Sequence, residues 1–261
     1  MLLALDVGNT QTVVGLFDDD YPPRHTWRLT TVAERTADEL ALLLRDLLAL
    51  VGLSPEQVDG AAVSSSVPVV TTTVARMVER WFPVPLVVAD VASTAFMPVR
   101  YDPPGDVGPD RLVDAVGALD LSPAPLVVVD LGTATTFNAV SAAGEYLGGA
   151  LVPGIAISLD ALFSHAAALR RVELVPPKRS IGGSTVEALR SGVLLGYASL
   201  VDGMCRRFED ELGPCTVIAT GGLAPLVVEH CTEVDRHEPW LTLHGLRIVY
   251  QREIARRGVS A

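Results

Sequence analysis

The hydrophobic and polar positions of the chain follow two periods, and together they predict an α/β protein. Short apolar runs bounded by turn residues predict buried strands. Longer segments with apolar residues at helical spacing, such as the leucines of 36–50, predict helices. The expected strands are 2–5, 12–17, 25–30, 61–63, 86–89, 126–129, 136–141, 146–152 and 216–219, and the expected helices are 36–50, 70–81, 109–121, 155–169, 185–211 and 243–255.

The order of expected elements restarts near residue 126, which indicates a duplication. Residues 6–12 (DVGNTQT) and 130–136 (DLGTATT) share the pattern D-x-G-x-x-x-T. Each copy follows an apolar strand and leads into another strand. One copy has little weight because a glycine in a hairpin turn is common. Two copies in the same order of elements predict related halves, 1–121 and 122–261, that face each other across a cleft.

The residue types in the two turns are suited to binding phosphate. Gly8 and Gly132 lack a Cβ, so the backbone can bend tightly and approach a ligand. Exposed N–H groups in such a turn form an anion site, and threonine hydroxyls add donors without charge. The carboxylates of Asp6 and Asp130 could hold the hydrated Mg²⁺ of ATP. The alternative is a pair of ordinary hairpins. The threonines that supply hydroxyl donors in the two turns are Thr10, Thr12, Thr133, Thr135 and Thr136.

Other nucleotide-binding patterns do not fit this chain. The P-loop pattern G-x-x-x-x-G-K-[ST] is absent. The first turn leads into a strand, whereas a dinucleotide-binding fold needs a helix there. A late turn, Thr220-Gly221-Gly222, could let a nucleobase or ribose lie against backbone, or it could be a plain strand-to-helix turn. The whole arrangement resembles the acetate kinase, sugar kinase, Hsp70 and actin superfamily.

Composition and net charge limit the kinds of molecule that the chain is expected to bind and the compartment in which it is expected to work. Hydrophobic residues make up 49% of the 261 residues, enough for a substantial core, and the formal net charge is −11. Long-range attraction to nucleic acid is therefore not expected. No apolar run is long enough to span a bilayer and no signal peptide is evident. The three cysteines form no disulfide framework, which favours a reducing, cytoplasmic location.

The segment between the two turns carries candidate chemistry for a phosphate acceptor. A loop rich in glycine and proline, 101–108, enters an expected helix at Asp110 and Arg111. The helix dipole favours the ionised form of Asp110, which could accept a proton from a substrate hydroxyl. The planar fork of Arg111 could hold a carboxylate or a phosphoryl group. The alternative is a first-turn acid beside a surface arginine.

These motifs together resemble the type III pantothenate kinase family, which begins coenzyme A biosynthesis. The segment 6–10 is similar to its ATP motif, Gly108-x-Asp110-Arg111 to its pantothenate motif, and 130–136 to its second phosphate motif. The resemblance covers essentially the whole chain. Further matching segments are 65–68, 148–149 with 153–154, Gly182-x-x-Thr185 with Gly192 and Gly196, and 241–246.

The resemblance implies a fold, an activity and a set of residue roles. The implied fold is a duplicated actin-like (ribonuclease H-like) two-domain α/β fold with ATP in the cleft between the halves. The implied activity is ATP-dependent phosphorylation of pantothenate to 4′-phosphopantothenate by a homodimer, with Mg²⁺ and a monovalent cation, K⁺ or NH₄⁺. Asp110 would be the general base. Asp130 would hold the monovalent cation, and Asp6 would hold Mg²⁺ through water. ATP would be bound by Asp6, Val7, Gly8, Asn9, Thr10, Gln11, Thr12, Val13 and Thr133, and pantothenate by Tyr101, Gly108, Pro109, Asp110, Arg111 and Thr185.

Two positions depart from the family pattern, and two other functions remain as alternatives. Pro109 stands where the family usually has a small residue, although proline fits a helix start. His244 stands where an acidic residue is common. The same fold could phosphorylate another small hydroxy acid, or it could serve as an ATP-dependent regulator. A regulator would more readily lose Asp110, Arg111 or Asp130, and all three are present.

Overall fold

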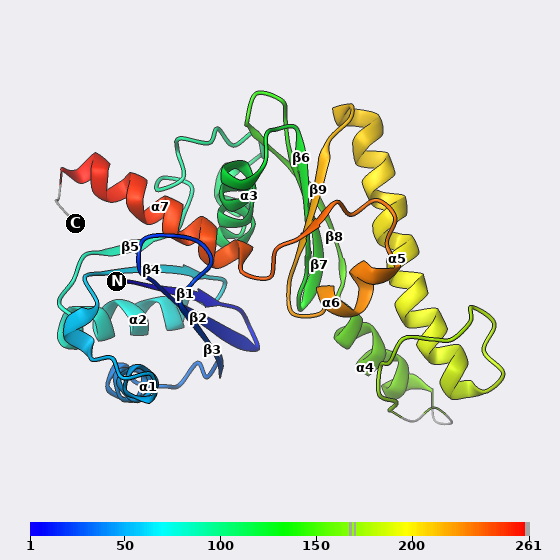
Figure 1. Cartoon of the computed structure of the whole chain (residues 1–261), viewed down its shortest axis with the longest axis horizontal. Helices are drawn as coiled ribbons and strands as arrows, with labels where there is room; N and C mark the ends of the chain where they lie inside the picture. Colours follow the sequence, from blue (N-terminus) through cyan, green and yellow to red (C-terminus); the bar gives the residue numbers. More distant parts are fainter. Residues whose placement is uncertain (167–168, 170, 259–261) are drawn as a thin grey trace. The chain divides into compact units, whose positions relative to one another are not determined.

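The computed structural model describes residues 1–166, 169 and 171–258, which form two α/β units (Figure 1). Unit 1 comprises Met1–Asp120 together with the segment that starts at Trp240, and unit 2 comprises Leu121–Pro239. The expected division at 121/122 is therefore close for the main boundary. It differs for the closing segment, because helix α7 (Leu241–Arg257) packs on strands of unit 1.

Unit 1 is built on a mixed five-stranded sheet in the order β3-β2-β1-β4-β5. The central strand β1 is antiparallel to β2 and parallel to β4. An antiparallel pair can be joined by a tight turn, whereas a parallel pair needs a crossover connection. The strands are β1 Leu2–Val7, β2 Gln11–Phe17, β3 His25–Thr30, β4 Gly60–Ser65 and β5 Leu86–Val88.

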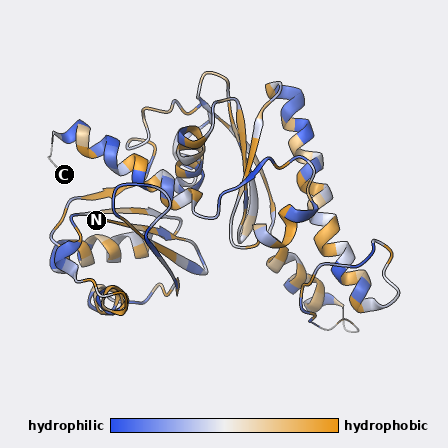
Figure 2. Cartoon of the chain, in the orientation of Figure 1, coloured by the Kyte–Doolittle hydropathy of each residue, from blue (hydrophilic) through white to orange (hydrophobic). Residues whose placement is uncertain are grey.

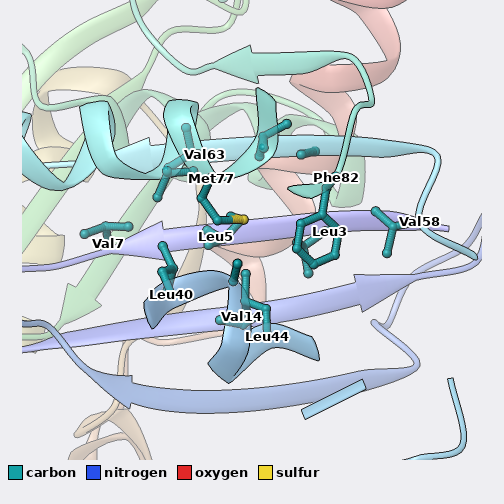
Figure 3. Close-up of a cluster of buried hydrophobic side chains, with 14 of the residues drawn as sticks. Leu3, Leu5, Val7, Val14, Leu40, Leu44, Val58, Val63, Met77 and Phe82 are labelled. Atoms are coloured by element: carbon teal, nitrogen blue, oxygen red, sulfur yellow. The ribbon is translucent and has the colours of Figure 1, made fainter. Parts of the chain in front are cut away.

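Helices cover both faces of this sheet. One face packs on α1 (Ala37–Leu50) and α2 (Pro68–Trp81) through a buried apolar cluster that includes Leu5, Leu40 and Met77 (Figure 3). The opposite face packs on α7, where Gly15 and Gly60 leave room for Leu243 and Tyr250. The remaining helices of this unit are α3 (Pro109–Leu121) and the short 3₁₀ turns η1 (Pro55–Gln57) and η2 (Pro104–Asp106).

Unit 2 repeats the strand order of unit 1. Its sheet runs β8-β7-β6-β9-β10, with β6 antiparallel to β7 and parallel to β9. Strand for strand this is the pairing of unit 1, so the predicted duplication is confirmed at the level of topology. The elements are β6 Leu126–Leu131, β7 Ala134–Val140, β8 Tyr146–Pro153, α4 Ile155–His165, α5 Thr185–Leu212, β9 Thr216–Thr220, α6 Ala224–Val227, η3 Val228–His230 and β10 Arg236–His237.

The long helix α5 supplies most of the apolar cover of the second sheet. Leu194 and Val201 of α5 are fully buried in one cluster with Val129 and Phe137 of the sheet. Asp202 of the same helix is buried as well. Its carboxylate accepts hydrogen bonds from the backbone N–H groups of Thr232 and Glu233 and from the Thr232 hydroxyl at 2.8–3.1 Å, which fixes the loop before β10 to the helix.

Each expected strand and helix is present, with shifts at the ends. The helix expected over 155–169 ends at His165, and Ala167 and Ala168 lie outside the described residues. The 176–180 loop is confirmed. The sequence pattern missed α6 and β10, which are too short to show a period. Within the described part of the chain, no helix is long and apolar enough to cross a membrane.

Helices α3 and α7 cross at a pair of glycines, and this contact yields a stability prediction. A Cβ on Gly245 would collide with the backbone of Val113 in α3. We expect Gly245→Ala to lower the free energy of unfolding by about 1–3 kcal/mol, because an extra methyl in a filled space forces the helices apart. Gly203 in α5 has open space at its Cβ position. Gly203→Ala should therefore raise the free energy of unfolding, by up to about 1 kcal/mol.

Urea denaturation of both variants and the wild type measures this difference. The paired design separates the α3–α7 contact from helix propensity, since both substitutions replace a helical glycine by alanine. Equal effects of the two substitutions would show that close packing at Gly245 does not hold α7 on unit 1.

Candidate active site

The first phosphate turn joins β1 to β2 in unit 1. The N–H of Gly8 donates to the carbonyl oxygen of Gln11 at 3.0 Å, and a Cβ on Gly8 would lie 3.1 Å from that oxygen. Asn9, Thr10 and Gln11 are exposed. The turn therefore offers solvent-facing backbone and side-chain groups on a fixed, tight bend, as a phosphate site requires.

A residue outside the motif, Thr31, holds this turn in place. Its hydroxyl donates to the carbonyl oxygen of Gly8 at 2.8 Å, and its N–H donates to that of Thr10 at 3.0 Å. The hydroxyl of buried Thr12 lies 2.9 Å from the Thr31 hydroxyl. Because the Thr31 proton goes to Gly8, the Thr12 hydroxyl is the donor of that bond. Thr12 thus contacts Thr31, and its side chain does not face solvent with those of Asn9 and Thr10.

Asp6 is the last residue but one of β1 and is half-buried. Its Cα partners are Val13 on β2 and Ser64 on β4. The next residue, Val7, points into the apolar cluster under α1 and α2. Alternation along the strand places the Asp6 carboxylate on the other face, at the end of the strand where the phosphate turn begins.

The acceptor segment brings Asp110, Gly108 and Arg111 together at the start of α3. One carboxylate oxygen of Asp110, Oδ1, accepts a hydrogen bond from the backbone N–H of Arg111 at 2.9 Å. A Cβ on Gly108 would collide with this oxygen. The glycine therefore leaves the space that the carboxylate occupies. Pro109 is the first residue of α3, a position where its missing N–H costs no helical hydrogen bond.

Arg111 and Tyr101 form the second half of the acceptor segment. Arg111 is only 7% exposed, and its guanidinium carbon lies 5.9 Å from the centre of the Tyr101 ring. A guanidinium over an aromatic face is stabilised by the ring quadrupole. The alternative, a surface arginine, is therefore wrong, because this cation is buried and lies beside an aromatic residue of the predicted substrate site.

The rest of α3 is held by α7. The Thr242 hydroxyl donates to the buried Asp114 carboxylate at 2.7 Å, and Nε2 of buried His244 lies 2.9 Å from Oδ2 of Asp120. The His244 ring also packs against Tyr21, with ring centroids 4.5 Å apart. His244 thus has defined partners in unit 1 and lies away from the first turn of α3.

The second phosphate turn joins β6 to β7 in unit 2. The N–H of Gly132 donates to the carbonyl oxygen of Ala134 at 3.0 Å, and the N–H of Gly154 donates to that of Thr133 at 3.2 Å. A Cβ on Gly154 would collide with the Thr133 backbone. The start of α4 therefore packs closely against this turn. Asp130 is half-buried at the end of β6, as Asp6 is at the end of β1.

The late glycine pair lies against the second phosphate turn. Gly221 has φ +99, and a Cβ there would collide with Asp130 and the Leu131 backbone. The N–H of Leu223 donates to the carbonyl oxygen of Leu131 at 3.1 Å. Only glycine fits this close approach in a left-handed conformation. The structure thus brings together in unit 2 the two turns that the sequence associated with phosphate and adenosine.

Thr185 belongs to unit 2, whereas the acceptor segment belongs to unit 1. It is exposed at the first turn of α5, beside the helix cap Ser184, whose hydroxyl accepts from the N–H of Glu187 at 3.3 Å. The Glu187 carboxylate accepts from the N–H of Gly183 at 2.7 Å. The loop before α5 is therefore fixed to the helix that carries Thr185.

Two further findings limit the chemistry of the site. Within the described residues, no three His, Cys, Asp or Glu side chains form a group that could hold a metal. Burial raises the pKa of the Cys205 and Cys231 thiols to about 12, so both stay protonated near neutral pH and are poor nucleophiles.

Comparisons with known proteins agree with the two-unit fold. A Campylobacter jejuni protein named as a Baf family transcriptional activator superposes with a TM-score of 0.63 at 16% identity, over 97% of this chain and 99% of that one. An activator of 2-hydroxyisocaproyl-CoA dehydratase from Clostridium difficile, solved with bound ADPNP, gives 0.53 at 11% identity, over 100% and 98%. At such identities these structures support the actin-like fold alone.

Sequence relatives carry more information. The Streptomyces avermitilis type III pantothenate kinase is 48% identical over 98% of this chain and 100% of its own length. The Frankia alni type III pantothenate kinase is 49% identical over 97% and 100%. The family model for type III pantothenate kinase matches residues 2–207. The chain therefore belongs to the type III pantothenate kinase family.

Proposed function

We propose that this chain transfers the γ-phosphoryl group of ATP to the primary hydroxyl of pantothenate, giving 4′-phosphopantothenate, the first step of coenzyme A biosynthesis. The observation that carries the proposal is the start of α3, where Asp110, Arg111 and Tyr101 meet within a chain of this family. A carboxylate that can take a proton and a cation that can hold an anion are the two groups this acceptor needs.

Asp110 acts as the general base in this proposal. It stands in the first turn of α3, at the positive end of the helix dipole. The hydrogen bond from the N–H of Arg111 fixes one carboxylate oxygen and leaves the other to accept the proton of the substrate hydroxyl. Phosphoryl transfer depends mainly on position and charge, so a fixed base contributes by orienting the attacking oxygen.

Arg111, Tyr101, Gly108, Pro109 and Thr185 bind the acceptor in this proposal. The buried guanidinium of Arg111 suits the carboxylate of pantothenate, since a planar fork and a low local dielectric strengthen such a pair. Tyr101 holds the guanidinium plane. Gly108 and Pro109 shape the backbone around Asp110.

The two phosphate turns bind ATP in this proposal. In unit 1 the backbone of 6–13 and the exposed Asn9 and Thr10 contact phosphate oxygens, and in unit 2 Thr133 does so beside the turn at Gly221. The single carboxylate of Asp6 suits Mg²⁺ that keeps its waters and takes its other ligands from phosphate. When bound, Mg²⁺ neutralises charge on the transferred group. Asp130 suits a monovalent cation, K⁺ or NH₄⁺.

A homodimer is the proposed assembly, in the cytoplasm, where the three free thiols remain reduced. Helix α4 supports the dimer. Its sequence is apolar along most of its length (Figure 2), yet Ile155 is its only buried residue among those described. A helix that is apolar on all sides is normally covered. A second copy of the chain would provide that cover for Ile157 and Leu162, which are 48% and 40% exposed.

The reaction is tested by a coupled assay of ADP formation with pantothenate and a panel of other small hydroxy acids and sugars. We expect turnover that requires pantothenate and rises with K⁺ or NH₄⁺, and an Asp130→Asn variant that no longer responds to either ion. Turnover with another acceptor in place of pantothenate would indicate a different kinase. ADP formation without any acceptor is transfer of the phosphoryl group to water and would contradict the proposal. The absence of any turnover would favour an ATP-dependent regulator.

The base is tested by Asp110→Asn. We expect kcat to fall by roughly 10²–10⁴, because an amide cannot take the hydroxyl proton. The Kd for ATP, measured by calorimetry, should change by less than about twofold, since the phosphate turns are intact. Asp106→Asn removes an exposed carboxylate of η2 in the same segment and serves as the matched control. A near-normal kcat in Asp110→Asn would show that another group accepts the proton.

The dimer is tested by replacing two exposed residues of α4. We expect Ile157→Glu with Leu162→Glu to convert a particle of twice the 27.6 kDa chain mass into a monomer, because four carboxylates would face each other in the interface. Light scattering after size-exclusion chromatography gives the mass. Leu50→Glu changes a leucine of unit 1 that is 79% exposed and should leave the mass unchanged. A double variant that keeps the wild-type mass would place the interface elsewhere.

A further inference from the structure

Ser64 is fully buried in β4, and its hydroxyl has no hydrogen-bond partner. The next two serines differ. The Ser65 hydroxyl donates to the carbonyl oxygen of Val67 at 3.0 Å, and the Ser66 hydroxyl donates to that of Val7 at 3.3 Å. A buried hydroxyl without a partner lowers stability, and most buried polar groups are paired. Folding alone therefore gives no reason for a hydroxyl at Ser64.

The register of the sheet places Ser64 beside Asp6. Strands β1 and β4 are parallel, and Asp6 and Ser64 are Cα partners in that pairing. Their neighbours Leu5 and Val63 both point into the apolar cluster under α1 and α2. Alternation then puts Asp6 and Ser64 together on the opposite face, on strands about 4.8 Å apart. The register therefore places the Ser64 hydroxyl and the Asp6 carboxylate side by side on one face of the sheet.

Unit 2 repeats this pairing independently. Asp130, the counterpart of Asp6, has Thr220 as its Cα partner on the parallel strand β9. Thr220 is 2% exposed. In both units, therefore, a buried hydroxyl residue stands next to the carboxylate at the end of the central strand. Two copies of the pair are difficult to attribute to packing, which an alanine would satisfy as well.

We propose that Ser64 is a positioning residue for Asp6. Its hydroxyl donates a hydrogen bond to one oxygen of the Asp6 carboxylate and turns the other oxygen toward the hydrated Mg²⁺ of ATP. This hydrogen bond supplies the partner that the Ser64 hydroxyl lacks. We expect the bond to form when the nucleotide binds. Groups that orient a metal-binding carboxylate in this way set metal affinity without touching the metal. The inference rests on the proposed function, in which Asp6 lies on the Mg–ATP side.

Ser64→Ala tests the inference through the Mg²⁺ dependence of nucleotide binding. Calorimetry with ADP at a series of Mg²⁺ concentrations gives the concentration for half-maximal binding. We expect Ser64→Ala to raise it about tenfold, the lower end of the range for such positioning groups. ADP binding without Mg²⁺ should not change. The melting temperature of the free protein should stay equal or rise, because the substitution removes an unpaired buried hydroxyl.

Kinetics and two further variants sharpen the test. In Ser64→Ala the KM for Mg–ATP should rise, while the KM for pantothenate and kcat at saturating Mg²⁺ should change by less than about twofold. Ser64→Thr keeps a hydroxyl, as Thr220 does in unit 2, and should keep the wild-type Mg²⁺ dependence. Thr72→Val removes the hydroxyl of an exposed residue of α2 and is the matched control.

The possible results separate this inference from the proposed function. An unchanged Mg²⁺ requirement in Ser64→Ala, or an equal loss of ADP binding with and without Mg²⁺, would overturn the role of Ser64 while leaving ATP use intact. A wild-type protein that does not bind ADP at any Mg²⁺ concentration would overturn the proposed function instead.

Discussion

The double pairing of one central strand in each unit is the constraint on which the site depends. Strands β1 and β6 each have an antiparallel partner on one edge and a parallel partner on the other. A tight turn joins the central strand to its antiparallel partner at the carboxyl end of the central strand. The parallel partner has its own carboxyl end at that same end of the sheet. A carboxylate placed there, Asp6 or Asp130, is therefore next to both a phosphate-type turn and a neighbouring strand end.

The same backbone carries different side-chain contacts in the two units, so the duplicated turns are not equivalent. In unit 1 the Thr12 hydroxyl binds Thr31, which in turn holds the phosphate turn. In unit 2 the corresponding Thr136 accepts from the amide of Asn138, whose carbonyl oxygen accepts from the fully buried Tyr146. The threonine thus supports the turn in one unit and joins a buried polar chain within the sheet in the other. The two turns therefore differ in the contacts made by their matching threonines.

Local sequence determined what could be predicted here. Periodicity and turn residues gave the strands, the long helices and the position of Asp110, since each depends on residues close in sequence. Contacts between residues far apart in the sequence could not be predicted from these local patterns. Thr31 lies well beyond the D-x-G motif, Ser64 is one of three consecutive serines, and the attachment of α7 to unit 1 depends on the fit of Gly245 against α3. The position of Thr12 in the motif also could not show that its hydroxyl is hydrogen-bonded to Thr31.

The closing helix explains one departure from the family pattern. His244 occupies a position where the family resemblance leads us to expect an acid, and its Nε2 lies 2.9 Å from the Asp120 carboxylate at the far end of α3. An acid at 244 would place a buried carboxylate beside the exposed carboxylate of Asp120, and like charges at that distance are unfavourable. An imidazole can instead donate to Asp120. With the Thr242–Asp114 bond, it fixes α3 along its length, and Asp110 stands on the first turn of that helix. The orientation of the proposed base therefore depends on residues from the other end of the chain.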